Sequence, residues 1–283
     1  MDTETDACSG IVPTHLATGV GAGVDVSIDV RAVIRDVART PVHPDAIARV
    51  AARIAGALAI SVLGLTGLLL LRVDLVLHID TWLTAGEPYK RWPTLAHLAH
   101  TLDYAGQRGI MVPVLLVFAA YATFRVRSWR PVIVVGFALL SVNIVVGAMK
   151  YITARPSPRL GPAPLFDPHI VGTVGLFPSG HAANAVLIWG VGVYLGYICL
   201  GWSHRAMKRG AWTVAIVAFV VSACSLFQQY HWPTDLAAGT MVGGAILAAT
   251  VAADRWRPGW FLPLDFATRD LINSRRRRDS LDA

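Results

Sequence analysis

The chain has 283 residues and a formal net charge of +7, yet only 15% of its residues are charged and 54% are hydrophobic. Soluble domains carry about 25% charged residues, so this composition excludes an ordinary soluble globule and is also too apolar for a disordered chain. Three cysteines are too few for a disulfide scaffold. A polytopic membrane protein is therefore expected.

Residues 1–45 begin with the acidic residues Asp2, Glu4 and Asp6 and contain no early apolar run. A secretory signal peptide needs a basic start followed by an apolar core, so this segment does not resemble one. We predict a flexible cytoplasmic tail here. A second, basic tail is predicted over 259–283, and the membrane domain between them is predicted over 46–258.

Six apolar segments follow the first tail, each 15 to 19 residues long: 54–71, 110–124, 131–149, 182–200, 211–227 and 236–253. At about 1.5 Å of rise per residue, 19 helical residues span about 28 Å, close to the thickness of the hydrocarbon layer. The sequence therefore predicts an all-α protein with six transmembrane helices. The aromatic-rich stretch 72–109, between the first two spans, is predicted to form interfacial helices.

The basic residues are distributed unevenly along the chain. Of the 25 Lys and Arg residues, 18 lie in residues 1–53, in the loops 125–130 and 201–210, and in residues 254–283. Cytoplasmic loops carry the excess of positive charge, so both termini are predicted to be cytoplasmic. The basic residues lie between apolar runs and form no single basic face, so no nucleic-acid partner is expected.

Three polar clusters fall at the outer ends of the predicted helices. They are Lys150 with Arg155 and Arg159, Ser179-Gly180-His181, and His231 with Asp235. Ionisable residues at this depth are costly and indicate function. Arginines and the N–H groups of a helix start both favour phosphate. A cationic collar at the lipid headgroups is the alternative for the first cluster alone.

The two histidines suit phosphoryl transfer. Asp235 lies four residues after His231, so its carboxylate can orient one imidazole nitrogen and leave the other nucleophilic. His181 can supply a proton to a leaving group. Among the loop residues, Asp167 and Asp235 are too few carboxylates for a divalent-metal mechanism. We therefore expect neither a metal nor another cofactor.

These motifs resemble the type 2 phosphatidic acid phosphatase family, whose members share a six-helix membrane core. Pro-Ser-Gly-His is matched at 178–181, and His-x-x-x-Asp is matched at 231–235. The resemblance implies that His231 is the nucleophile, Asp235 its orienting partner and His181 the acid and base. It also implies that Lys150, Arg155, Ser179 and Gly180 hold the phosphate.

Two departures from the family pattern concern arginines. After six intervening residues beyond the lysine, the chain reads Ser157-Pro158 instead of Arg-Pro, with Arg155 and Arg159 on either side. The third motif reads Cys224-Ser225 instead of Ser-Arg. Losing one charged contact to phosphate costs about 1.5–3 kcal/mol. Arg155 or Arg159 could compensate for the first loss, and no neighbour in sequence replaces the second.

The resemblance implies a metal-independent, multi-pass phosphatase in the cell membrane that acts on a lipid phosphate or polyprenyl pyrophosphate at the outer face. A lipid-linked phosphotransferase and a non-catalytic lipid-binding relative remain alternatives. A transporter would need more polar residues along its interior than Asn143 and Asn184. Vanadate-dependent haloperoxidases share a related site but are soluble. The sequence names neither the lipid nor the oligomeric state.

Overall fold

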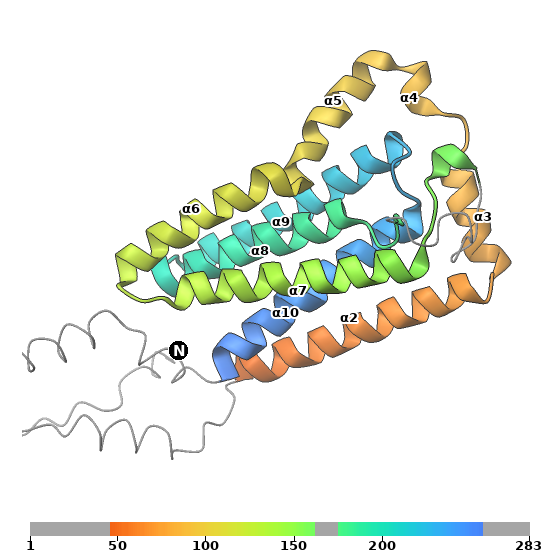
Figure 1. Ribbon diagram of the computed structural model, residues 1–283. Helices are drawn as coiled ribbons and strands as arrows, with labels where there is room; N and C mark the ends of the chain where they lie inside the picture. The colour runs from red at the N-terminus through yellow and green to blue at the C-terminus, as the bar shows by residue number, and fades with distance from the viewer. Residues whose placement is uncertain (1–45, 162–174, 257–283) are drawn as a thin grey trace, which may run out of the picture. The chain divides into compact units, whose positions relative to one another are not determined.

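The computed structural model describes residues 46–161 and 175–256, and all of these belong to one compact unit. The described residues form helices, turns and loops, and none of them forms a strand (Figure 1). The two predicted tails, 1–45 and 259–283, lie outside the described residues.

Six long helices are apolar enough to cross a membrane, which confirms the predicted all-α fold. They are α2 (Ala46–Leu70), α6 (Arg108–Val126), α7 (Arg130–Thr153), α8 (Gly180–Leu200), α9 (His204–Phe227) and α10 (Pro233–Trp256). Each helix extends beyond its predicted apolar segment at one or both ends. In α9, for example, Ser203 caps the start by accepting a hydrogen bond from the Ala206 N–H, so the helix begins seven residues before Ala211.

The stretch between α2 and α6 is helical, as predicted. It contains α3 (Asp74–Leu83), α4 (Pro88–Arg91), α5 (Pro93–Asp103) and the 3-10 turn η1 (Tyr104–Gly106). Pro88 and Pro93 stand at the first positions of α4 and α5, where the missing N–H costs nothing. α3 packs on α10, and α5 packs on α9 (Figure 1).

Helix α8 is the centre of the bundle and contacts α6, α7, α9 and α10 (Figure 1). Its side chains Leu187, Val191 and Leu195 are fully buried and belong to the main apolar core. The outward faces of α2, α6 and α9 carry exposed Leu63, Phe124 and other large apolar side chains. Such a distribution suits a bundle whose periphery contacts lipid.

Two glycines bring α10 against α8. Gly239 and Gly243 are four residues apart, the spacing that lets membrane helices approach closely. A Cβ at Gly239 would overlap the carbonyl oxygen of Ser179, and one at Gly243 would overlap that of Ala183. The close approach places Asp235, one turn before Gly239, beside the start of α8, where the Ser179 N–H donates to the Asp235 carbonyl at 2.9 Å.

Candidate active site

The predicted polar clusters meet at one end of the helix bundle. His181 lies in the first turn of α8 and His231 lies two residues before α10. Their ring centroids are 6.4 Å apart. The Lys150 side chain reaches the same place from the last turn of α7, because a Cβ built on Gly180 would lie 3.9 Å from Lys150 Cε. The structure therefore brings Lys150, Gly180 and both histidines together.

His231 faces Asp235 from a buried position. The distance from His231 Nδ1 to Asp235 Oδ2 is 3.5 Å, which is ion-pair range but long for a hydrogen bond. Nδ1 has no hydrogen-bond partner within the described residues, and Asp235 Oδ2 accepts from the Trp232 N–H at 3.1 Å. A shift of about 0.5 Å would complete the bond. In this arrangement the opposite nitrogen, Nε2, is left for a substrate.

His181 has a carboxylate partner of its own, which the sequence did not indicate. Asp103, at the end of α5, places Oδ2 at 3.4 Å from His181 Nε2. The second oxygen, Oδ1, accepts a hydrogen bond from Ser225 Oγ at 2.6 Å. Asp103 and Ser225 are buried, whereas a third of the His181 side chain is exposed. His181 is thus the more accessible of the two histidines.

The terminal N–H groups of Arg155 bind other protein side chains, whereas a phosphate ligand requires N–H groups that are free to donate. Its side chain is buried and donates to Asp80, Thr234 and Asp235, with distances of 2.6, 2.7 and 2.6 Å. The guanidinium also lies over the Trp232 ring, 5.2 Å from its centroid. Asp80 in turn accepts from the Thr234 N–H at 3.0 Å. Arg155 therefore joins α3 to the start of α10 and holds the carboxylate of Asp235.

Arg159 is also occupied elsewhere. Its Nε and Nη2 donate to the Gln228 carbonyl oxygen at 3.1 and 2.6 Å. The guanidinium lies between the rings of Tyr89 and Tyr230, at 4.4 and 4.8 Å from their centroids. Ser157, at the position of the missing arginine, donates weakly to the Gln229 carbonyl at 3.3 Å. These contacts fix the loop after α9. They engage the Arg159 guanidinium with the Gln228 carbonyl and two tyrosine rings instead of leaving it open to phosphate.

Lys150 and the start of α8 provide the anion-binding groups that remain. Among the described residues, Lys150 has no hydrogen bond or ion pair, and it interacts electrostatically with Asp235 and Arg108. Ser179 Oγ accepts from the Ala182 N–H at 3.4 Å, so Ser179 caps α8 and is itself buried. The N–H groups that begin α8 can therefore face an anion next to Lys150.

Residues 131–258 match the family model of the PAP2 superfamily. This matched segment, which we call the PAP2 region, is similar to the PAP2 superfamily. The family match confirms the predicted resemblance, and it covers α7 to α10 with every predicted site residue.

The PAP2 region also matches by fold. The structure resembles the crystal structure described as the first transmembrane PAP2 type phosphatidylglycerolphosphate phosphatase from Bacillus subtilis. The TM-score is 0.59, the match covers 70% of this chain and 94% of that chain, and 18% of the aligned residues are identical. At this identity the likeness shows the fold alone. No curated protein sequence matches the chain.

Three site residues that sequence reasoning missed lie before the PAP2 region. They are Asp80 in α3, Asp103 in α5 and Arg108 in the first turn of α6. The sequence offers little indication of the two acids, because a lone acid in an amphipathic stretch usually faces solvent. Asp80 and Asp103 are instead buried, at 1% and 5% exposure. A buried carboxylate needs a partner, and here the partners are Arg155 for Asp80 and Ser225 with His181 for Asp103.

The described residues contain no group of three or more His, Cys, Asp or Glu side chains that could hold a metal ion. His97 and His100, which share a face of α5, are exposed. His100 contacts the hydroxyl groups of Tyr104 and Tyr230 at 3.2 and 3.3 Å. These two histidines are therefore surface residues beside the site.

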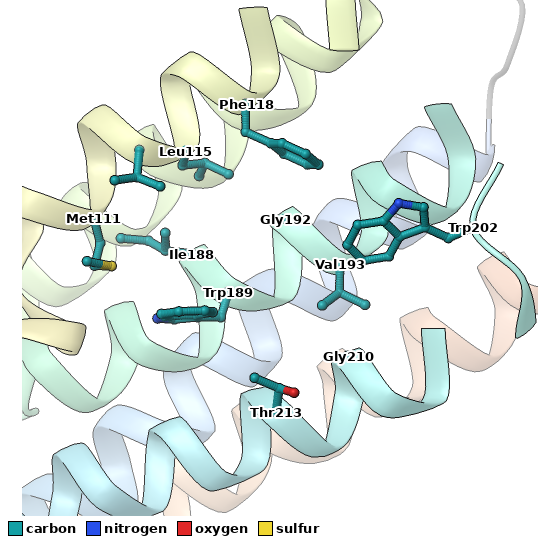
Figure 2. A pocket seen from close by; sticks show the side chains of 11 residues that line it. Met111, Leu115, Phe118, Ile188, Trp189, Gly192, Val193, Trp202, Gly210 and Thr213 are labelled. Carbon is teal, nitrogen blue, oxygen red and sulfur yellow. The ribbon is translucent and has the colours of Figure 1, made fainter. Parts of the chain in front are cut away.

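An apolar groove lies between α6, α8 and α9. Its volume is about 320 Å³, and it is lined by Met111, Leu115, Phe118, Trp189, Gly192 and Val193 among others (Figure 2). Met111 stands one turn after Arg108 on α6. The Trp189 indole donates to the Ala105 carbonyl of η1 at 3.1 Å, beside Asp103. One end of the groove thus lies close to the elements that carry the site.

Proposed function

We propose that the protein is an integral-membrane phosphatase that hydrolyses a lipid phosphate or polyprenyl pyrophosphate through a phosphohistidine. The PAP2 region supports a phosphatase. The observation that carries the proposal is the pair of histidines, whose ring centroids are 6.4 Å apart. Each histidine has its own buried carboxylate, and Lys150 stands beside them.

In the first step His231 Nε2 attacks phosphorus and forms the N–P bond. The bond from phosphorus to the lipid oxygen breaks, and His181 gives its proton to that oxygen so that the leaving group departs as an alcohol or, from a pyrophosphate, as the lipid monophosphate. Asp235 stabilises the positive charge that develops on His231, because opposite charges 3.5 Å apart attract.

In the second step His181, now neutral, accepts a proton from water. The water oxygen attacks phosphorus, the N–P bond breaks and inorganic phosphate leaves. Lys150 and the N–H groups of the first turn of α8 neutralise the phosphoryl oxygens in both steps. Asp103 faces His181 Nε2 throughout, so it supports the protonated form that the first step requires.

The lipid tail is proposed to lie in the groove of α6, α8 and α9, with its phosphate at the histidines. The lining is apolar and includes two tryptophans, Trp189 and Trp202, which suits an acyl or prenyl chain (Figure 2). The excess of Lys and Arg in the loops 125–130 and 201–210 supports cytoplasmic termini and a site at the outer face.

The test is phosphate release by the detergent-purified protein in EDTA, from phosphatidic acid, phosphatidylglycerol phosphate and a polyprenyl pyrophosphate. His231→Ala runs beside it, with His97→Ala as the matched control because His97 is exposed on α5. We expect release that survives EDTA, is lost in His231→Ala and persists in His97→Ala.

Three other outcomes contradict the proposal. Release that His231→Ala retains would exclude His231 as the nucleophile. Absence of release from all three lipids, together with phosphoryl transfer to an added acceptor lipid, would assign the protein as a phosphotransferase. Absence of both reactions, with retained binding of the lipids, would leave the lipid-binding relative.

A further inference from the structure

Arg108 lies at the phosphate-binding end of the PAP2 region although it lies outside it in sequence. It stands in the first turn of α6. A Cβ built on Gly180 would lie 3.5 Å from Arg108 Nη2, nearer than to any atom of Lys150. Arg108 also contributes to the electrostatic environment of both Lys150 and His181. Two cations from different helices therefore flank the same N-terminal turn of α8.

The donor groups of Arg108 are largely unused. Its Nη1 donates to Asn143 Oδ1 on α7. Among the described residues this is its one hydrogen bond, and no carboxylate lies within 4 Å of its guanidinium. A guanidinium has five N–H donors, so four remain. Arg155 and Arg159, in contrast, are engaged by Asp80, Asp235 and the Gln228 carbonyl.

We propose that Arg108 is a phosphate-binding residue of the site and supplies the charge that Ser157 and Ser225 do not. The proposal rests on the proposed function, because the phosphate is the one that His231 would attack. Arginine suits this position because its planar fork can donate two parallel hydrogen bonds to a phosphoryl group. Lys150 provides the second cation, whose Cε would lie 3.9 Å from the same built Cβ of Gly180.

Asn143 positions this arginine. It lies two helical turns before Lys150 on α7, and its Nδ2 donates to the Leu139 carbonyl at 2.7 Å. That bond fixes the amide so that Oδ1 faces Arg108. An amide oxygen orients the guanidinium without neutralising it, whereas a carboxylate at the same place would compete with phosphate for its charge.

The experiment measures inhibition of the full-length protein by inorganic phosphate, together with kcat and KM for its lipid. The variants are Arg108→Ala, Arg108→Lys and Asn143→Asp. Arg125→Ala is the control, since Arg125 is an exposed arginine at the opposite end of α6. Losing a charged hydrogen bond predicts that Arg108→Ala raises the inhibition constant for phosphate about 10- to 100-fold. Arg108→Lys should restore part of this loss.

Asn143→Asp provides the independent variant, because it keeps the acceptor for Arg108 and adds a negative charge. We expect it to weaken phosphate inhibition as well, while Arg125→Ala stays within about twofold of the wild type. If Arg108→Ala and Asn143→Asp both inhibit like the wild type while His231→Ala is inactive, Arg108 is not a phosphate ligand and the proposed function stands.

If the wild type releases no phosphate from any lipid, the proposed function fails and Arg108 is tested by binding. Inorganic phosphate should then protect the wild type and Arg125→Ala against thermal unfolding, and should not protect Arg108→Ala. Equal protection of all three proteins, or protection of none, would overturn the assignment of Arg108.

Discussion

Arg155 Nη1 donates to Asp235 Oδ1 at 2.6 Å, and both side chains are buried. Asp235 therefore serves two partners, with Oδ1 on Arg155 and Oδ2 on the His231 side. In the proposed mechanism Arg155 acts through this carboxylate, which its hydrogen bond holds in place. These contacts favour a positioning role for Arg155 over the predicted phosphate contact.

Arg155→Met is expected to destabilise the protein. Removing one member of a buried ion pair costs about 3–5 kcal/mol, because the remaining charge is left unpaired. Here two carboxylates, Asp80 and Asp235, would lose their partner. Thermal unfolding in detergent measures the loss. Arg159→Ala is the control, whose loss should be smaller since its contacts are partly exposed. Equal stability of Arg155→Met and the wild type would contradict the assignment.

Asp235→Asn should reduce kcat by about 10²–10⁴-fold, the range typical of proton-transfer and orienting groups. The amide keeps the size of the carboxylate but removes the charge that faces His231 Nδ1. Single-turnover phosphate release measures the effect. Binding of inorganic phosphate should change little, because the carboxylate of Asp235 contacts Arg155 and faces His231 instead of binding phosphate. A loss confined to KM would argue against the orienting role.

Asp103→Asn should lower kcat about tenfold with little change in KM, because the carboxylate lies 3.4 Å from His181 Nε2 and supports its acid form. Ser225→Ala should have a smaller effect in the same direction, since it removes the 2.6 Å bond that holds Asp103. Ser222→Ala, one turn earlier on α9, serves as the control. The idea fails if Asp103→Asn turns over at the wild-type rate.

Gly239→Ala should lower both stability and activity. The added Cβ would overlap the Ser179 carbonyl oxygen and separate α10 from α8, and overpacking of this kind costs about 1–3 kcal/mol. Gly147→Ala on α7 is the matched variant, because a Cβ there has open space. Gly239→Ala should unfold at a lower temperature than Gly147→Ala. Equal unfolding temperatures would show that the contact between Gly239 and Ser179 does not position the site.

Gly192→Leu should discriminate between long and short lipid tails. Gly192 lines the groove and has open space around it, so the new side chain fills the groove without disturbing the helices (Figure 2). We expect a raised KM for long-chain substrates and an unchanged KM for short-chain ones. Gly64→Leu on the exposed face of α2 is the control. The same KM ratio in both variants would place the tail elsewhere.

The sequence by itself determined the six membrane helices, because each carries enough consecutive apolar residues to cross the bilayer. It also placed His181, His231 and Asp235 at the right helix ends, since the order of spans decides which loops lie on the same side. These inferences depend on local composition and short spacings, which a single sequence contains in full.

Only the tertiary structure decided which charges are free. Arg155 and Arg159 lie within ten residues of Lys150, yet the buried Asp80 and the Gln228 carbonyl engage them. Arg108 and Asp103 lie outside the motifs and reach the site because α6 and η1 pack on α8. A buried carboxylate selects its cation by distance in space, and that distance depends on how α3, α5 and α6 pack, which no spacing along the chain encodes.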